Sequence, residues 1–218
     1  MLTRRCVALA AVLVAMLPTM ALSQPSRSFK DSWFWGVKGG VIAFSTATVE
    51  NRVEPVAGIE WLLTRTQGAL YLALDQSMFD ATSALVDTAG QSHRINIRDM
   101  RRATAALMAF PFALESSLGA IRPYAGVGFA LNFIRSAAFV SIPTDSARRR
   151  DVMKRLEDQQ DRAAPLLIVG LQLQVSRLAA FGQVTAMPAE TRFLLNGRPT
   201  AFAEVGVRFN AGRSKTTY

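Results

Sequence analysis

The sequence offers one histidine that could act as a catalytic base. His93 follows Ser92, and Asp87 and Asp99 are nearby in the chain. A serine hydroxyl activated by histidine would be the chemistry of an acyl hydrolase, such as one that acts on lipid A. Adjacent residues of an extended chain point to opposite sides, so Ser92 and His93 do not form a catalytic pair by sequence alone. We therefore predict that the protein is not an enzyme and that His93 lies in a loop, exposed to water.

Other kinds of reactive site have less support. Glu54 and Glu60 would share one face of a strand, but they fit partners for basic residues better than the carboxylate pair of a glycosidase. Gly126 and Gly128 lie inside an alternating apolar segment and not before a helix, so they do not form a nucleotide-binding loop. The single cysteine, Cys6, falls in the first 23 residues, and the sequence has no cluster of histidine and cysteine for a metal. We expect no metal and no other cofactor.

Residues 1–23 have the pattern of an export signal peptide. Arg4 and Arg5 precede an apolar run over residues 7–17, and small residues at 21–23 provide a cleavage site. An N-terminal membrane anchor is the alternative, but the run is short for a span and is followed by a proline. Cleavage would lower the formal charge from +9 to +7 by removing the two arginines. An exported basic protein can meet lipopolysaccharide phosphates, whereas no motif for nucleic acid is present.

Apolar residues alternate with small or polar residues in eight segments between residues 33 and 209. Residues 121–133, IRPYAGVGFALNF, have one wholly apolar face and one face of small or polar side chains. Residues 165–176 alternate in the same way. Because successive side chains of a strand point to opposite faces, each segment predicts a strand with one apolar face. The expected fold is all-β, an eight-stranded antiparallel up-and-down barrel, although six or ten strands remain possible.

The predicted connections differ in length between the two ends of the barrel. Short turns are expected at residues 64–67, 115–120 and 176–177, and longer loops at residues 46–51, 80–101, 135–164 and 188–199. Short periplasmic turns and longer outer loops are typical of a transmembrane β-barrel of the outer membrane. The longest loop is charged and helix-prone, with Thr144 or Asp145 as a possible helix cap. Its basic run at residues 148–150 is nearly balanced by acidic residues, so we interpret it as a solvated helix.

The apolar faces decide which side of the barrel is wet. An eight-stranded barrel has an interior just wide enough for side chains, and the small and polar faces suit it better than stacked Trp, Phe and Leu. We therefore place the apolar faces in lipid and predict a polar network in the lumen, formed by Lys38, Glu54, Glu60, Asp75, Arg122, Tyr124, Gln172, Gln174, Glu204 and Arg208.

The segment from Arg102 to Leu114 is harder to assign because its second half is almost all apolar. We expect Met108, Phe110, Phe112 and Leu114 to face lipid and the small alanines to face the lumen.

A soluble alternative also stays open, in which a periplasmic lipocalin-like barrel turns its apolar faces inward and carries an apolar ligand.

The export signal, the strand sequence PYAGVGFAL, the alternation of short turns with long loops and the ending AFAEVGVRF resemble the small outer-membrane β-barrels that include OmpX/Ail, OmpW and the OmpA transmembrane domain. The resemblance implies that Phe209 is the signal for the barrel-assembly machinery, although NAGRSKTTY follows it. Along the chain it implies a signal peptide (1–23), a short N-terminal segment (24–32), the barrel (33–209) and a tail (210–218).

This resemblance also implies a location and a role. We expect a monomer in the bacterial outer membrane, in contact with its lipid and lipopolysaccharide, with a structural or surface-interaction function and a lumen filled by side chains. A narrow channel for small or apolar solutes is the alternative that the OmpW resemblance implies.

Overall fold

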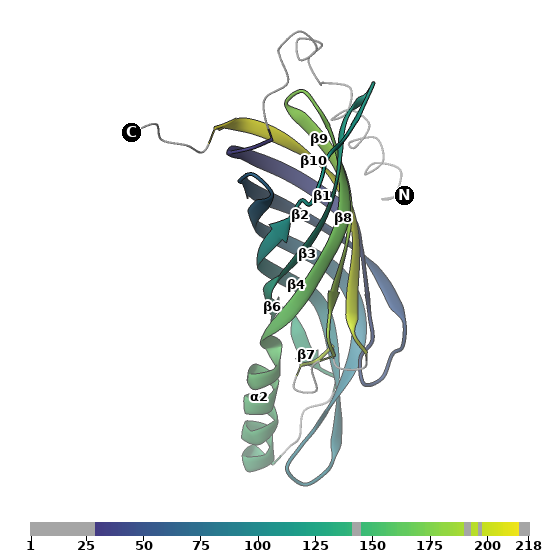
Figure 1. Cartoon of the computed structure of the whole chain (residues 1–218). Helices are drawn as coiled ribbons and strands as arrows, with labels where there is room; N and C mark the ends of the chain where they lie inside the picture. Colours follow the sequence, from purple (N-terminus) through teal and green to yellow (C-terminus); the bar gives the residue numbers. More distant parts are fainter. Residues whose placement is uncertain (1–28, 141–144, 190–192, 196–197, 214–218) are drawn as a thin grey trace, which may run out of the picture.

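The computed structural model describes residues 29–140, 145–189, 193–195 and 198–213 (Figure 1). The expected signal peptide and Thr144 lie outside these residues. Eight long strands form the wall: β1 (Ser32–Phe44), β2 (Arg52–Thr64), β3 (Gly68–Val86), β4 (Ser92–Ala109), β6 (Gly119–Ile134), β8 (Asp161–Val175), β9 (Leu178–Met187) and β10 (Thr200–Arg213). Two three-residue strands, β5 (Leu114–Ser116) and β7 (Ala137–Phe139), and one helix, α2 (Ser146–Gln160), lie in the connections.

The eight long strands close into one antiparallel barrel. Each pairs with its neighbour along the chain, and β1 pairs with β10 to complete the ring. The line of paired residues that starts at Trp33 crosses every strand and returns to β1 at Ala43, ten residues farther along. A stagger of this size requires strands tilted by about 40° to the barrel axis. The predicted fold is confirmed, with eight strands in the ring.

The two ends of the barrel differ. At one end, which we call the turn end, lie the first and last described residues, the short β2–β3 and β8–β9 turns, and a longer β4–β6 connection over residues 110–118, where a short turn at residues 115–120 was expected. At the opposite end, the loop end, lie the connections β1–β2, β3–β4, β6–β8 and β9–β10. Figure 1 shows α2 and the β3–β4 hairpin projecting together from the loop end. The elements that project from the loop end match the longer outer structures expected, whereas the turn end combines two short turns with one longer connection.

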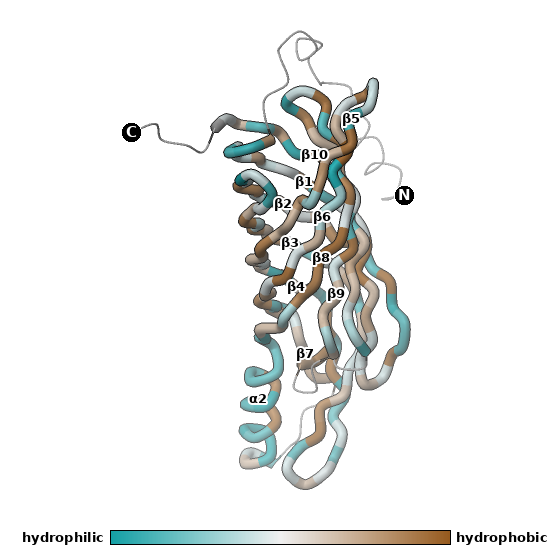
Figure 2. Tube along the Cα trace, in the orientation of Figure 1, coloured by the Kyte–Doolittle hydropathy of each residue, from teal (hydrophilic) through white to brown (hydrophobic). Residues whose placement is uncertain are grey.

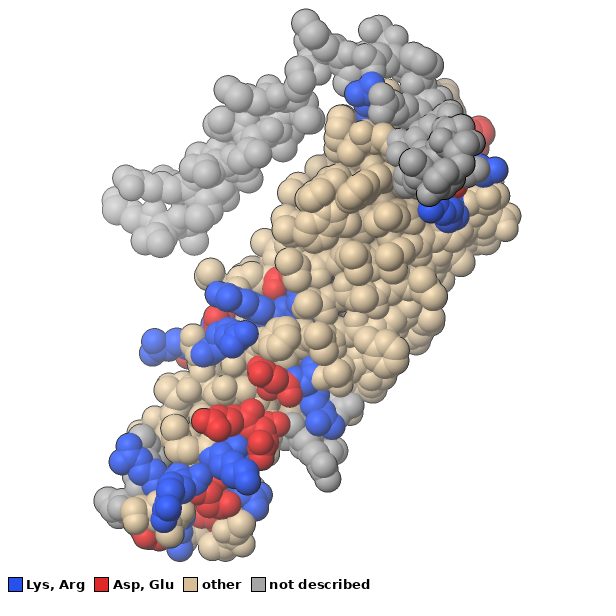
Figure 3. All heavy atoms as spheres, turned by 90° about the vertical axis from the view of Figure 1, so that its left-hand side faces the viewer, with Lys and Arg blue, Asp and Glu red and all other residues tan. Residues whose placement is uncertain are grey.

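The outer wall carries the apolar faces that the alternation predicted. Large apolar side chains such as Val37, Val127 and Leu167 are exposed there, at 58%, 60% and 60% of their surface. Figure 2 shows the alternation along the strands, and Figure 3 shows, on the face in view, a region of the wall free of charge that gives way to charged side chains toward the loop end. In lipid this apolar band of the wall needs no further partner.

The prediction of a loop at residues 80–101 is wrong. β3 continues to Val86 and β4 begins at Ser92, so a turn of only residues 87–91 joins them. In this hairpin most inward positions are apolar, as at Ile95 and Ile97, although Ser83 is also buried, while outward positions such as Arg94 are exposed. The hairpin protrudes beyond the apolar band, so its outer face lacks the lipid-facing residues by which the other strands were recognised.

The expected orientation of β4 is also wrong. Met108 and Phe110 are 3% exposed and point into the barrel, whereas the alternate residues Ala105 and Leu107 face outward. Phe112 and Leu114 lie past the end of β4 and are exposed at the turn end. The large side chains point inward because they fill the turn end of the lumen.

The helix expected in the longest loop is present as α2. Asp145 caps it, since its carboxylate accepts hydrogen bonds from the backbone N–H of Ala147 (3.3 Å) and Arg148 (3.4 Å). Val152 and Leu156 are the buried residues of α2, and its remaining surface is largely charged. Within the described ranges, no helix is long and apolar enough to cross a membrane.

Candidate functional site in the lumen

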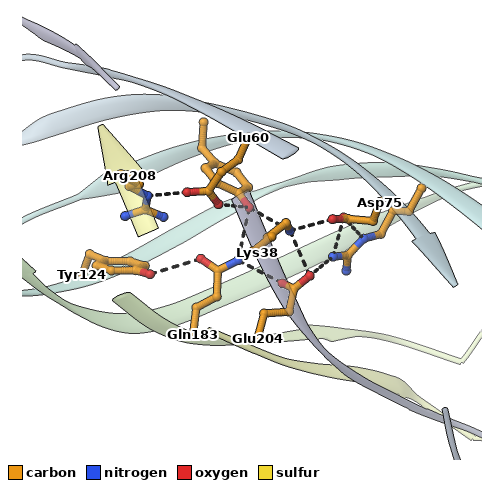
Figure 4. Close-up of polar contacts among 9 residues, drawn as sticks. Lys38, Glu60, Asp75, Tyr124, Gln183, Glu204 and Arg208 are labelled. Carbon is orange, nitrogen blue, oxygen red and sulfur yellow. Dashed lines mark hydrogen bonds and ion pairs between the residues drawn. The ribbon is translucent and has the colours of Figure 1, made fainter. Parts of the chain in front are cut away.

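Charged and polar side chains from seven of the eight wall strands meet in the middle of the lumen (Figure 4). Each stands at an inward position of the strand alternation, so the register of the barrel brings them together. We call the following set the lumen network: Lys38, Glu60, Tyr71, Asp75, Arg102, Gln172, Gln183, Glu204 and Arg208. At most 6% of the surface of any of its charged residues is exposed.

Lys38 stands between two carboxylates. Its Nζ lies 2.9 Å from Asp75 Oδ1 and 2.9 Å from Glu204 Oε1, and it donates a hydrogen bond to the Tyr71 hydroxyl at 3.1 Å. The ammonium group can donate three hydrogen bonds, and three oxygens surround it. The contact with Asp75 is an ion pair and not an aligned hydrogen bond, because Asp75 Oδ1 has no hydrogen-bond partner.

Arg102 joins the same two carboxylates from the opposite side. Its Nε donates to Asp75 Oδ2 at 2.8 Å, and its Nη2 lies 2.7 Å from that oxygen and 2.9 Å from Glu204 Oε1. The guanidinium also stacks on the Phe202 ring, with 3.5 Å between its central carbon and the ring centroid. Asp75 and Glu204 are thus each shared by two cations.

Arg208 forms a second centre nearer the turn end. Its Nε donates to Glu60 Oε1, its Nη1 donates to Gln172 Oε1 at 2.6 Å, and its guanidinium lies 3.8 Å from the Phe181 ring centroid. Tyr71 connects the two centres, because its hydroxyl donates to Glu60 Oε2 at 3.0 Å and accepts from Lys38.

Gln183 links the first centre to both tyrosines. Its amide nitrogen donates to Glu204 Oε2 at 2.9 Å and to the Tyr71 hydroxyl at 3.1 Å, and its amide oxygen accepts from the Tyr124 hydroxyl at 3.1 Å. The described network therefore forms one connected unit that crosses the lumen.

The network is balanced in charge. Lys38, Arg102 and Arg208 are its cations, and three carboxylates, those of Glu60, Asp75 and Glu204, oppose them. Buried charges are tolerated when each has a partner of opposite sign, and removal of one partner leaves another charge buried and uncompensated. Each charge of the network therefore has a partner of opposite sign within the network.

A small residue makes room for the network at one close approach. A Cβ on Gly58 would lie 2.1 Å from Asp75 Oδ1 and 2.7 Å from the backbone oxygen of Leu74. Any side chain at this position would displace the carboxylate that Lys38 and Arg102 share.

Apolar side chains fill the lumen on both sides of the network. At the turn end, the ring centroids of Phe29 and Phe110 are 4.7 Å apart, and those of Phe110 and Tyr124 are 5.2 Å apart. At the loop end, the rings of Phe44 and Phe79 are 4.8 Å apart, within an apolar cluster that also contains buried Ile42, Leu85, Ile95, Ile97, Met100 and Ile134. We call these two groups the turn-end plug and the loop-end plug.

The residues expected to face the lumen are divided among three places. Seven lie in or beside the lumen network: Lys38, Glu60, Asp75, Tyr124, Gln172, Glu204 and Arg208. Arg122 and Gln174 form a separate pair near the turn end (3.2 Å), with the Arg122 guanidinium 4.8 Å from the Phe29 ring centroid. Glu54 is half-buried and pairs with Arg52 at the loop end (2.7 Å).

Sequence reasoning missed Tyr71, Arg102 and Gln183 as members of the network. Tyr71 is four residues before Asp75 and so shares its strand face, and Gln183 alternates with the apolar Val184, so alternation alone could have found them. Arg102 was lost because the orientation of β4 was reversed, since it shares the face of Met108 and Phe110. Correct orientation of β4 would have supplied the third cation.

The possible catalytic histidine does not reach the lumen network. The expectation that it lies in a water-exposed loop is wrong, because His93 belongs to β4 and only 11% of its side-chain surface is exposed. His93 Nε2 lies 3.1 Å from Asp87 Oδ2 at the tip of the β3–β4 hairpin, and Arg148 Nε of α2 lies 3.8 Å from the same oxygen. Among the described residues, no three His, Cys, Asp or Glu side chains gather as a metal site would require.

Phe209 lies on the outer wall, where 46% of its surface is exposed. β10 continues beyond it to Arg213. Asn210, the next residue, is fully buried, and its Nδ2 donates to Ser32 Oγ at 3.2 Å. The closure of the barrel therefore includes part of the segment that follows Phe209.

Of the comparisons with known proteins, the one with solved structures bears on the fold. No protein-family model matches the sequence, and no curated protein matches it. Among solved structures, the Neisserial surface protein A (NspA) aligns with 81% of this chain and 96% of its own, at a TM-score of 0.52 and 9% identity.

Two further solved structures align over a similar length. OprG from Pseudomonas aeruginosa has a TM-score of 0.44 and 11% identity, and covers 83% of this chain and 94% of its own. Ail of Yersinia pestis, in complex with the heparin analogue sucrose octasulfate, has a TM-score of 0.43 and 8% identity, and covers 84% of this chain and 99% of its own. The closed eight-strand ring and the likeness to NspA lead to one conclusion: this chain has the fold of the small eight-stranded outer-membrane β-barrels.

Proposed function

We propose that the protein is a non-enzymatic barrel of the bacterial outer membrane that does not conduct ions and that presents its loop end for structural or surface interactions. The observation that carries this proposal is the lumen network, in which three cations and three carboxylates compensate one another between two apolar plugs. An ion entering the lumen would have to displace paired charges and packed aromatic rings.

The outward band supports the membrane location, since a soluble protein would expose these residues to water. Val37, Val127 and Leu167 are among the many large apolar residues of the wall that have no protein contact over half of their surface. A lipocalin-like carrier would hold its apolar faces inward around a ligand, whereas here the inward face holds the charged network. This orientation favours lipid as the partner of the wall.

The assembly signal is also part of the proposal. Phe209 stands on the lipid-facing side of the closing strand, where a partner could reach its ring during insertion. We propose that the barrel-assembly machinery recognises this strand and that the barrel acts as a monomer, because β1 and β10 already pair with each other.

Planar-bilayer recording tests the closed lumen. The mature protein is folded in detergent, its folding is verified by the heat-dependent shift on a gel, and it is added to a bilayer in which a known porin serves as the positive control. We expect no discrete conductance steps. Steps from the folded wild type would instead support the narrow-channel alternative, and a further change in their size in Glu204→Ala would place the conducting path through the lumen network.

A further inference from the structure

The outer wall has a basic groove where the apolar band ends near the loop end. The groove has a volume of about 480 Å³ and runs across β2, β3, β4 and β6. Its apolar floor includes Ile59, Leu74 and Ala103, and its loop-end rim consists of Gln76, Arg101, Phe133 and Arg135. Unlike the lumen network, these rim residues stand on the lipid-facing side of the wall.

The strand register explains why the rim is compact. Arg101 is paired with Gln76 on β3 and with Phe133 on β6, so the three outward side chains lie side by side on adjacent strands. Arg101 Nε donates to Gln76 Oε1 at 2.8 Å, which holds the guanidinium along the wall. The Arg135 guanidinium lies 5.4 Å from the Phe133 ring centroid. Both arginines are exposed.

Neither arginine is neutralised within the described part of the chain. No carboxylate oxygen there comes within 4.0 Å of either guanidinium, although Asp99 lies two residues from Arg101 on β4 and Asp161 of β8 is paired with Phe133. By contrast, every arginine of the lumen network has a carboxylate partner. The two free guanidinium groups therefore remain available to an external anion.

Depth in the membrane limits which anion can reach them. Ala103 and Leu131, each two residues closer to the turn end than Arg101 and Phe133, belong to the apolar band, and Leu131 is 48% exposed. Arg101 thus lies at the step from hydrocarbon to headgroups, where an aromatic ring and a basic side chain commonly meet the membrane surface. A ligand that fits has acyl chains for the apolar floor and a phosphate for the rim.

We propose that this groove binds a phosphate group of lipid A, the phosphorylated glycolipid of the outer leaflet, between Arg101 and Arg135. Guanidinium groups bind phosphate through paired N–H donors, and the acyl chains would lie over Ile59 and Leu74. The inference rests on the proposed membrane location, because it needs the loop end to face the outer leaflet.

Native mass spectrometry of the folded chain in detergent, titrated with bisphosphorylated lipid A, tests this site. The double variant Arg101→Gln/Arg135→Gln removes both guanidinium groups, and we expect its affinity for lipid A to fall about tenfold, since exposed charge pairs each contribute a few-fold. Arg149→Gln is the matched control: it removes an exposed arginine of α2 and should bind as the wild type does.

Two other lipids separate the possible sources of phosphate. Dephosphorylated lipid A and phosphatidylglycerol should each bind more weakly than bisphosphorylated lipid A. Only bisphosphorylated lipid A should bind the double variant more weakly than the wild type. Equal lipid A affinity in the double variant, an equal loss in Arg149→Gln, or phosphatidylglycerol binding as tight as that of lipid A would overturn the proposal. The gel shift and the bilayer recording do not depend on these arginines, so failure here would leave the proposed function intact.

Discussion

Replacement of Glu204 by alanine should be among the most damaging single changes to the lumen network. Glu204 is 2% exposed and accepts from Lys38, Arg102 and Gln183, each at 2.9 Å. Without it, three buried cations would face two carboxylates. Removal of one partner from a buried ion pair commonly costs about 3–5 kcal/mol in unfolding free energy, because it leaves a charge uncompensated. We expect a loss within this range.

Urea unfolding of the folded protein in lipid vesicles measures this loss. The indole rings of Trp33, Trp35 and Trp61 lie on the outer wall, so their fluorescence should change when the barrel leaves the lipid. Glu204→Gln separates charge from packing: it keeps the shape and an oxygen acceptor, and it should still destabilise the barrel because the charge is lost.

Two comparisons make the result decisive. Glu54→Ala removes a carboxylate that pairs with the exposed Arg52 at the loop end, and such a pair contributes about 0–1 kcal/mol. Adding Lys38→Met to Glu204→Ala should cost less than the sum of the two single changes, because it restores the balance of charge. Equal losses for Glu204→Ala and Glu54→Ala, or strictly additive effects of Lys38→Met, would refute the view that the network is an energetic unit.

Three further predictions concern the wall, the hairpin tip and the closing strand. Gly40→Ala should lower the unfolding free energy of the barrel by about 1–3 kcal/mol, because the new Cβ would lie 2.0 Å from a backbone oxygen of β10. In the control Gly39→Ala, the nearest atom to the new Cβ is 3.7 Å away, and urea unfolding compares the two variants. The hydrogen bond from His93 lowers the pKa of Asp87. The ionised carboxylate therefore stabilises the hairpin tip at pH values above the unfolded pKa of about 3.9, and this stabilisation is lost as the pH falls through the lower pKa of the folded state. Amide NMR signals of residues 87–91 should report the change. Asn210→Ala should cost about 1–3 kcal/mol in unfolding free energy, since it removes a fully buried side chain that bonds to β1.

For each of these three predictions, one result would contradict the structural explanation. Equal stability of Gly39→Ala and Gly40→Ala would mean that β1 and β10 are less closely packed than the structure has them. If the pH-dependent change in the amide signals of residues 87–91 persists in Asp87→Asn, another group must cause it. The Asp87 carboxylate contacts only groups of the hairpin tip and Arg148 of α2, all at the loop end, so we expect a local transition and not global unfolding. An Asn210→Ala protein as stable as the wild type would show that the barrel closes without the end of β10.

Much of the wall could be predicted from the sequence because lipid imposes a simple rule on it. Outward residues such as Val127 and Leu167 must be apolar, and inward residues such as Lys38 and Glu204 are then found by alternation alone. Helix α2 was recognised for a different reason, the capping Asp145 before a charged segment.

The errors arose where this rule does not apply. The β3–β4 hairpin beyond the apolar band has an outer face in water, so Arg94 and its neighbours gave no lipid-facing signal. Met108 and Phe110 were assigned to lipid because they are large and apolar, but the same property suits a plug at the end of the lumen. Arg102 contacts Asp75 because the two residues are paired across β3 and β4, but its contact with Glu204 of β10 crosses the lumen and depends on the stagger of the closed ring, so it could not be predicted.

The most direct test of the whole account is gel migration of the mature protein from an outer-membrane fraction, with and without boiling. A closed barrel in lipid should be recovered in that fraction, resist SDS when unheated and change its migration on boiling. Recovery in the soluble periplasmic fraction, with the same migration before and after heating, would contradict the assignment of the apolar wall to lipid.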